Sequence, residues 1–234
     1  MQSKTLKVSI HQPSYFPWLG LLNKIARSDL FVLLDTVPLN DAAYQHRNHF
    51  LTQQGQSHLL TIPVRKKGYF NKPLQELEFA QTSWQKKHWN FLQANYAGAP
   101  FWSEFEPQLR LFYKKKFNNL GEALTESMRL SLNWYQLQTP MVLASDLNLE
   151  PLPNCSQKVD RIMQILKVTQ ATHYLSGEGA RVYQDKSYFV EHGIELEYQS
   201  YYAPKYLQSS PSFISGLSGL DALMHLGCRA KDLL

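Results

Sequence analysis

The sequence predicts an α/β protein with a Rossmann-like, mostly parallel sheet and a helical middle segment packed on it. Two strand–helix–strand patterns, one near each end of the chain, and three helical patterns between them support this prediction. Strands that alternate with helices along a chain usually form one parallel sheet. The helices then connect the strands in right-handed crossovers. We therefore expect a single domain over residues 1–234, with a sheet core from about 1–80 and 140–234 and a helical insertion at about 82–137.

The first pattern lies at the N-terminus. Residues 7–10 predict a short strand, and residues 30–34 form a continuous apolar run that is typical of a strand buried on both faces. Between them, residues 18–27 predict a helix because their apolar side chains recur at near-helical spacing. Pro17 lies at or just before the first turn of this helix, where a missing N–H group costs least.

The second pattern lies near the C-terminus, where a predicted strand, turn, helix and strand cover residues 172–175, 176–180, 181–191 and 194–198. Further strands are predicted at residues 59–64, 74–79 and 141–144. Helices are predicted at residues 84–96, 101–113, 120–135, 158–167 and 217–225.

The composition limits the cellular setting and the partners. The 234 residues include no apolar run long enough to span a bilayer, and the N-terminus lacks the apolar region of a signal peptide. Two cysteines, Cys155 and Cys228, give neither a disulfide framework nor a cysteine-rich zinc site. We expect a cytoplasmic protein without a membrane span. Its formal charge of +5 favours anionic partners such as phosphates, nucleotides or RNA. The partner that we expect is a small molecule with a phosphate or carboxylate group.

Three polar features follow predicted strands and mark a candidate site. His11 follows the first strand, Asp35 follows the strand at 30–34, and the turn Ser176-Gly177-Glu178-Gly179 follows a late strand. Ligands bind beyond the carboxyl ends of strands in open parallel sheets, and a helix N-terminus after such a turn favours an anion. A histidine there is able to act as an acid or a base near neutral pH, with Gln12 and Tyr15 crowded beside it.

Each of these features also has a structural interpretation. A histidine after a strand often forms only structural hydrogen bonds, and Asp35 could cap a turn with Asn40 and Asp41. Two glycines at a strand–helix junction are common, and the turn matches no complete phosphate-binding fingerprint.

Other polar and aromatic segments also allow two interpretations each. Arg47 could clamp a carboxylate or phosphate, or lie along a loop surface. Four tyrosines between Tyr198 and Tyr206 could stack on a base or sugar, or bury a crossing of the chain. The histidines at 46, 49 and 58 lack metal-ligand spacing, so no metal site is predicted.

Taken together, several motifs resemble those of the WbqC-like family of bacterial proteins along nearly the whole chain. The resemblance rests on VSIHQPSYFPWLGLLNKI with FVLLD, on RN at 47–48, WxxKH at 84–88, APF at 99–101 and YLSGxGA at 174–180, and on the late YxQ and LSxLD segments. Family members occur among enzymes that assemble surface polysaccharides and natural products. The resemblance therefore implies group transfer onto an activated sugar or an amine.

The same resemblance assigns residues to the site by position. His11, Lys24 and Asp35 become the catalytic candidates. The substrate-binding candidates are Gln12, Tyr15, Arg47, Asn48, His88, Ser176, Gly177, Gly179, Tyr206 and Gln208. The chain departs from the family pattern at Pro38-Leu39, His49 and His225, where a glutamine–aromatic pair, an arginine and an asparagine are expected. These departures concern which substrate the chain takes.

These observations are compatible with three functions, and they favour an enzyme of the transferase class. The leading hypothesis is acyl or aminoacyl transfer to an amine of a sugar or small metabolite, with His11 as the base, no required cofactor, and an acyl or aminoacyl carrier as a partner. The second is nucleotidyl transfer from ATP or CTP with Mg²⁺, by analogy with HIGH-type enzymes, although Pro13 and Tyr15 stand where a second histidine belongs. The third is a non-catalytic binding or scaffold protein of a biosynthetic complex.

Overall fold

A computed structural model describes residues 5–40, 44–65, 67–69, 71–153 and 158–234. Asp41 and Cys155, which enter the sequence predictions above, lie outside these residues. The contacts between residues divide the chain into two compact units. Unit 1 comprises Met1–Gln12, Asn23–Thr36 and Gln138–Tyr202, and unit 2 comprises Pro13–Leu22, Val37–Leu137 and Ala203–Leu234. None of the helices in the described part of the chain is long and apolar enough to cross a membrane.

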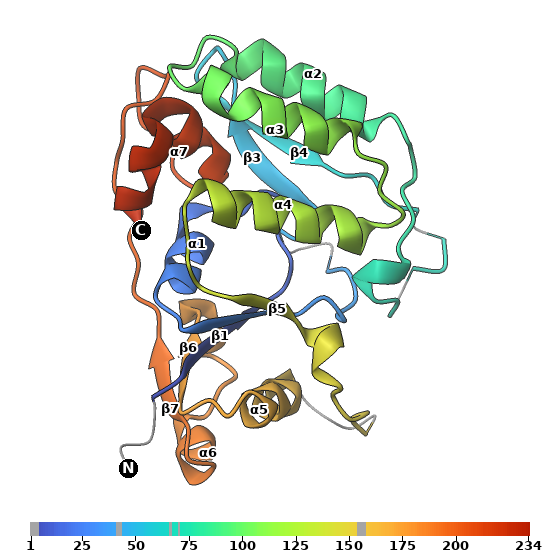
Figure 1. Ribbon diagram of the computed structural model, residues 1–234, viewed down its shortest axis with the longest axis vertical. Coiled ribbons are helices and arrows are strands. Elements are labelled where there is room, and N and C mark those ends of the chain that lie inside the picture. The colour runs from blue at the N-terminus through green and yellow to red at the C-terminus, as the bar shows by residue number, and fades with distance from the viewer. Residues whose placement is uncertain (1–4, 41–43, 66, 70, 154–157) are drawn as a thin grey trace. The chain divides into compact units, whose positions relative to one another are not determined.

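Unit 1 contains a five-stranded parallel sheet. Its strands are β1 (Lys7–His11), β2 (Leu30–Leu33), β5 (Met141–Leu143), β6 (His173–Ser176) and β7 (Glu195–Tyr198). They lie in the order β5-β2-β1-β6-β7, and every neighbouring pair is parallel (Figure 1). Counted along the chain, this is the 3-2-1-4-5 order of a Rossmann-like sheet. The predicted fold class is therefore confirmed.

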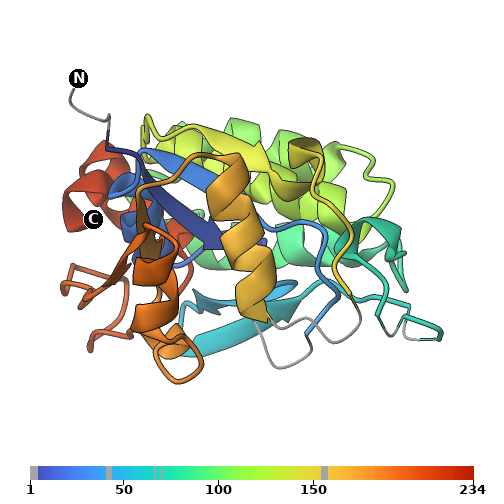
Figure 2. The same ribbon diagram turned by 90° about the horizontal axis from the view of Figure 1, so that it is seen from below.

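Two helices pack on one face of this sheet, α5 (Lys158–Val168) and α6 (Lys186–Glu191) (Figure 2). The 3-10 turns η2 (Ala144–Leu147) and η3 (Glu178–Ala180) follow β5 and β6, and α1 (Leu19–Ala26) connects β1 to β2. The unit boundary falls inside α1.

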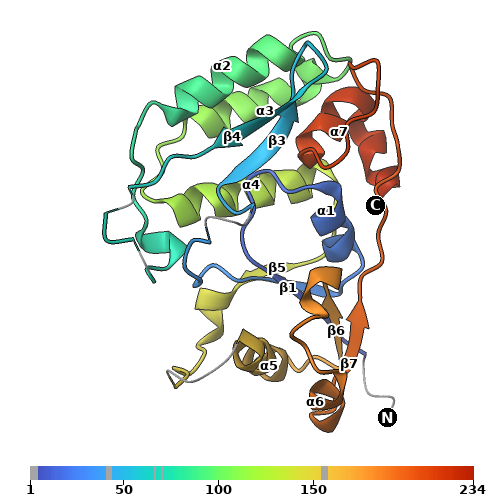
Figure 3. The same cartoon turned by 180° about the vertical axis from the view of Figure 1, so that it is seen from behind.

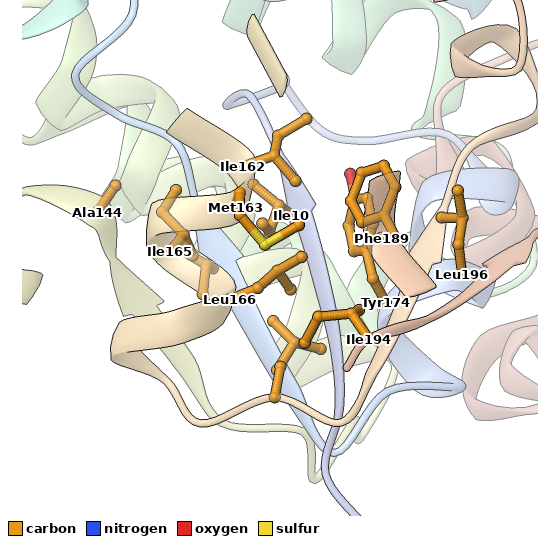
Figure 4. Packing of buried hydrophobic residues seen from close by; sticks show 13 residues of the cluster. Ile10, Ala144, Ile162, Met163, Ile165, Leu166, Tyr174, Phe189, Ile194 and Leu196 are labelled. Carbon is orange, nitrogen blue, oxygen red and sulfur yellow. The ribbon is translucent and has the colours of Figure 1, made fainter. Parts of the chain in front are cut away.

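Strand alternation determines which side chains of β1 enter this core. Ile10 lies in one buried cluster with Ile162 and Met163 of α5, as Figure 4 shows. Because successive residues of a strand point to opposite faces, His11 projects from the other face. In the same cluster Tyr174 and Phe189 stack with their ring centres 5.7 Å apart. The core thus fixes β1 against β6.

Unit 2 combines a β-hairpin with helices. The hairpin pairs β3 (Arg47–Leu51) with β4 (Ser57–Thr61) in antiparallel register. The helices are α2 (Trp84–Tyr96), α3 (Trp102–Lys114), α4 (Leu120–Trp134) and α7 (Gly219–Leu226), with the 3-10 segments η1 (Leu74–Glu76) and η4 (Gly227–Leu233). Helices α2 and α3 lie side by side (Figure 3).

Several local predictions differ from the structure. The strand predicted at 74–79 is wrong, because Leu74–Glu76 is a 3-10 turn; the buried side chains of Leu74 and Leu77 are three residues apart, the period of a 3-10 helix. The hairpin strands at 47–61 form their own two-stranded sheet instead of extending the sheet core. Gly55, with φ of +71°, closes their tight turn, so this pairing is local.

The helix predicted at 181–191 begins only at Lys186. Asp185 caps it by accepting a hydrogen bond from the Ser187 backbone N at 2.9 Å. Immediately before this cap, the backbone N of Gln184 still donates to the Ala180 carbonyl, which continues the turn after β6. The capping carboxylate therefore sets the start of α6.

We expect Gly219→Ala to destabilise the protein by about 1–3 kcal/mol. An added Cβ would lie 2.8 Å from Leu22 Cδ1 and 2.9 Å from the Pro17 carbonyl oxygen, which already accepts a hydrogen bond from the Gly219 N. Urea unfolding would measure the loss. Gly98→Ala is the control, because an added Cβ there meets no atom within 4 Å. Equal stability of the two variants would contradict this close packing.

Candidate functional site

The strand order of unit 1 reverses between β1 and β6, and this point brings together two of the predicted features. Ser9 pairs with Leu175, so the same register places His11 level with Gly177 at the carboxyl ends of adjacent strands. The connection after β1 leads to β2 on one side, and the connection after β6 leads to β7 on the other. In Rossmann-like sheets, ligands bind at this reversal.

His11 is neutral near pH 7. Its side chain is partly buried, and its Nδ1 lies 2.7 Å from the Gln12 carbonyl oxygen. A carbonyl oxygen only accepts, so Nδ1 carries the proton and the neutral ring has its lone pair on Nε2. Burial, and then the positive charge of Lys24, lower the pKa of His11 to about 3. The imidazole is thus able to orient a polar group but is a weak base.

The amine of Lys24 is a stronger base than the imidazole of His11. Its side chain is only 3% exposed, and its Nζ donates to the Ile10 carbonyl oxygen of β1 at 2.9 Å. Burial lowers the pKa of Lys24 to about 7, because the ammonium ion loses its hydration. Near neutral pH the amine therefore exists in both protonation states, as a general base requires.

Asp35 is a buried hydrogen-bond acceptor two residues beyond β2. Its Oδ1 accepts from the Ser145 backbone N at 3.0 Å, and its Oδ2 accepts from Ser145 Oγ at 2.7 Å. These bonds hold the turn that follows β5. Asp35 thus joins the ends of the neighbouring strands β2 and β5.

The turn after β6 is open. An added Cβ at Gly177 or Gly179 would meet no atom within 4 Å, and neither glycine has a positive φ. Neither packing nor backbone conformation requires glycine there, so what these residues provide is close access to the backbone. The helix N-terminus expected at this turn is absent among the described residues, because α6 starts at Lys186. Ser176 is buried, with its Oγ 3.5 Å from the Tyr174 hydroxyl.

Tyr15 and His88 form an internal network in unit 2. The His88 Nε2 lies 3.2 Å from the Thr61 carbonyl oxygen and therefore donates to it. Its Nδ1 then accepts from the Tyr15 hydroxyl at 2.9 Å, and that hydroxyl also bonds to the Tyr113 hydroxyl. Burial lowers the pKa of His88 to about 4, which agrees with a neutral ring. These bonds hold the segment around Tyr15 against α2 and α3.

Tyr206 and Gln208 also have an internal partner, the fully buried carboxylate of Asp221. Its Oδ2 accepts from the Tyr206 hydroxyl at 2.6 Å and from Gln208 Nε2 at 3.0 Å, and its Oδ1 accepts from the Tyr96 hydroxyl at 2.9 Å. Burial raises the pKa of Asp221. The motifs YxQ and LSxLD contain three of these residues, but their spacing did not indicate that Asp221 is the centre.

Arg47 and Asn48 have different surroundings on β3. The Asn48 Nδ2 donates to the Phe16 carbonyl oxygen at 2.7 Å, which fixes the segment before α1. The Arg47 guanidinium carbon lies 5.8 Å from the centre of the Tyr44 ring. Among the described residues its buried Nε has no hydrogen-bond partner. Within that same set, no three His, Cys, Asp or Glu side chains are grouped to hold a metal ion.

The strand order and the polar groups at its reversal define a Rossmann-like α/β protein with a candidate site at the carboxyl edge of the sheet. Comparison with known proteins identifies its family. The chain belongs to the WbqC-like protein family, whose model matches residues 12–233. It is 30% identical over 230 residues to the uncharacterized protein Rv1507c of Mycobacterium tuberculosis (strain ATCC 25618 / H37Rv), with 97% of each chain covered. No solved structure matches the chain.

Proposed function

We propose that the protein is a group-transfer enzyme that moves an acyl or aminoacyl group onto an amine of a sugar or small metabolite. The observation that supports this most directly is the buried Lys24 amine, with a pKa of about 7, near His11 at the strand-order reversal. Acylation of an amine needs a group that takes a proton near neutral pH, and Lys24 matches that need.

Lys24 is the base in this proposal, rather than His11. The acceptor nitrogen attacks the carbonyl carbon of the donor, a C–N bond forms, and the bond to the leaving group breaks. The surplus proton of the nitrogen passes to the neutral Lys24 Nζ, and the leaving group departs with the bonding electron pair. His11, with a pKa of about 3, holds a proton too weakly to serve as the acceptor at neutral pH.

His11 instead orients the acceptor. With its proton on Nδ1, the lone pair on Nε2 is suited to accept an N–H or O–H group of the acceptor. The open turn at Gly177 and Gly179 gives the backbone contact for the anionic part of the donor. Gln12 and Ser176 adjoin these two groups in sequence and remain candidate contacts, while Asp35 holds the neighbouring turn through Ser145.

We expect His11→Ala to lower kcat/KM by about 10- to 100-fold without shifting the pH midpoint of the reaction downward. The reason is that the variant loses an orienting hydrogen bond and keeps Lys24 as the base. Product formation from coenzyme A thioesters and aminoacyl donors with amino sugars, followed by mass spectrometry, would measure it. An unchanged rate would remove His11 from the site, and loss of the ionisation near pH 7 would make His11 the base.

A further inference from the structure

Unit 2 contains a pocket of about 240 Å³ lined by Trp18, Tyr44, Asn48 and Gly216. Water occupies about 30 Å³ per molecule in the liquid, and drug-sized ligands fill about 300–1,000 Å³. The pocket therefore suits one six-membered ring with a substituent. Two of its four lining residues are aromatic, which favours a ring-shaped ligand.

The lining residues are held in place by the surrounding structure. Asn48 Nδ2 donates to two carbonyl oxygens, of Tyr15 at 3.2 Å and Phe16 at 2.7 Å. Trp18 pairs with Ser218 in an isolated antiparallel bridge. Gly216 has a φ of +73° and open space at its α-carbon, so a side chain there would be strained and would project into free space. Tyr44 is 45% exposed and accessible to a ligand.

A cation lies next to Tyr44, one of the residues that line this pocket. The Arg47 guanidinium carbon is 5.8 Å from the centre of the Tyr44 ring. Its Nε is buried without a hydrogen-bond partner among the described residues. A buried donor without a partner is unfavourable, and arginine pairs readily with carboxylate or phosphate oxygens. Because Arg47 as a whole is only partly buried, an anionic group on the ligand would pair with the accessible part of its guanidinium group.

We infer that this pocket binds a small molecule that carries a single six-membered ring, a sugar or a pyrimidine, and a phosphate or carboxylate. The ring contacts Trp18 and Tyr44, and the anionic group pairs with Arg47. This site goes beyond the proposed transfer reaction, because it is argued from residues of unit 2 and does not depend on Lys24 chemistry.

Isothermal titration calorimetry of the full chain tests the site with orotate, glucose 1-phosphate and glucuronate. Uracil, glucose, inorganic phosphate and acetate are the matched half-ligands. At least one ring-bearing anion is expected to bind about tenfold more tightly than either of its halves, since a charge-assisted hydrogen bond contributes about this much. The heat of binding requires no product, so this result is independent of the transfer activity.

Four variants assign the binding to these residues. Arg47→Gln and Tyr44→Ala are expected to weaken it about tenfold or more, while Tyr44→Phe retains the ring and the affinity. Arg65→Gln is the charge control, because Arg65 is exposed and pairs with Glu78. Thermal unfolding verifies that each variant is folded. Absence of binding by all three ring-bearing anions, equal binding of a half-ligand, or unchanged affinity in Arg47→Gln would each overturn the inference.

Discussion

Replacing Lys24 by methionine is expected to slow group transfer at least about 100-fold, which is the usual minimum contribution of a general base. Methionine has a similar length and fills the buried space, but it cannot take a proton. In the unmodified protein the rate should rise as pH increases through about 7, because burial lowers the pKa of Lys24 to that value. The same mass-spectrometric assay over a range of pH would measure both effects.

The stability of this variant separates a lost base from a damaged fold. The pKa of Lys24 is about 7 in the folded protein and 10.5 as its ordinary value. Between these values the unfolded chain binds a proton that the folded protein does not, so this group makes stability rise with pH. Below pH 7 both states are protonated, and the folded protein bears the full cost of the buried ammonium ion.

Lys24→Met is therefore expected to be more stable than the unmodified protein at pH 6, by roughly 5 kcal/mol, with the gap closing toward pH 10. Lys167→Met is the matched control, because Lys167 is exposed on α5. The control should leave both rate and stability unchanged. A fully active Lys24→Met variant would exclude Lys24 as the base.

The largest loss of stability is expected from Asp221→Ala, about 3–5 kcal/mol in the free energy of unfolding. The carboxylate is fully buried and accepts from Tyr96, Tyr206 and Gln208. Alanine would remove the acceptor of three hydrogen bonds and open a cavity between segments that are far apart in sequence. Urea unfolding at neutral pH would measure the loss.

Two variants control this result. Asp221→Asn keeps the shape and one acceptor oxygen, so its loss should be smaller than that of alanine. Asp232→Ala removes an exposed carboxylate near the C-terminus and should be close to neutral. If Asp221→Ala cost less than about 1 kcal/mol, Asp221 would not be the centre of a stabilising network.

The parallel sheet could be predicted from sequence because its signals are local. A strand, a helix and a second strand follow one another within residues 7–33, and right-handed crossovers leave few ways to arrange them. Strand β3 at Arg47–Leu51 was not predicted, because its polar residues Arg47, Asn48 and His49 obscure the apolar pattern. Its partner strand was predicted at 59–64 and lies at Ser57–Thr61, which shows how weakly sequence fixes strand ends.

In the candidate site, too, only the features with local sequence signals could be predicted. His11 ends β1 and Gly177 directly follows β6, so the prediction of a parallel sheet was enough to expect them at one edge. The low pKa of Lys24 could not be predicted from sequence, because it depends on burial in the folded protein, where Nζ lies beside the Ile10 carbonyl of another element. Asp221 lies 125 residues from Tyr96, and no local spacing records that contact.

The protonation of Lys24 in the ligand-free protein would show whether its amine is a base at neutral pH. In protein labelled with ¹³C-lysine, the Lys24 signal is the one that Lys24→Met lacks, and its chemical shift can be followed by NMR from acid to alkaline pH. A midpoint near 7 is expected. A midpoint near 10, the ordinary value for lysine, would mean that the amine is charged at neutral pH and is not the base of a transfer reaction.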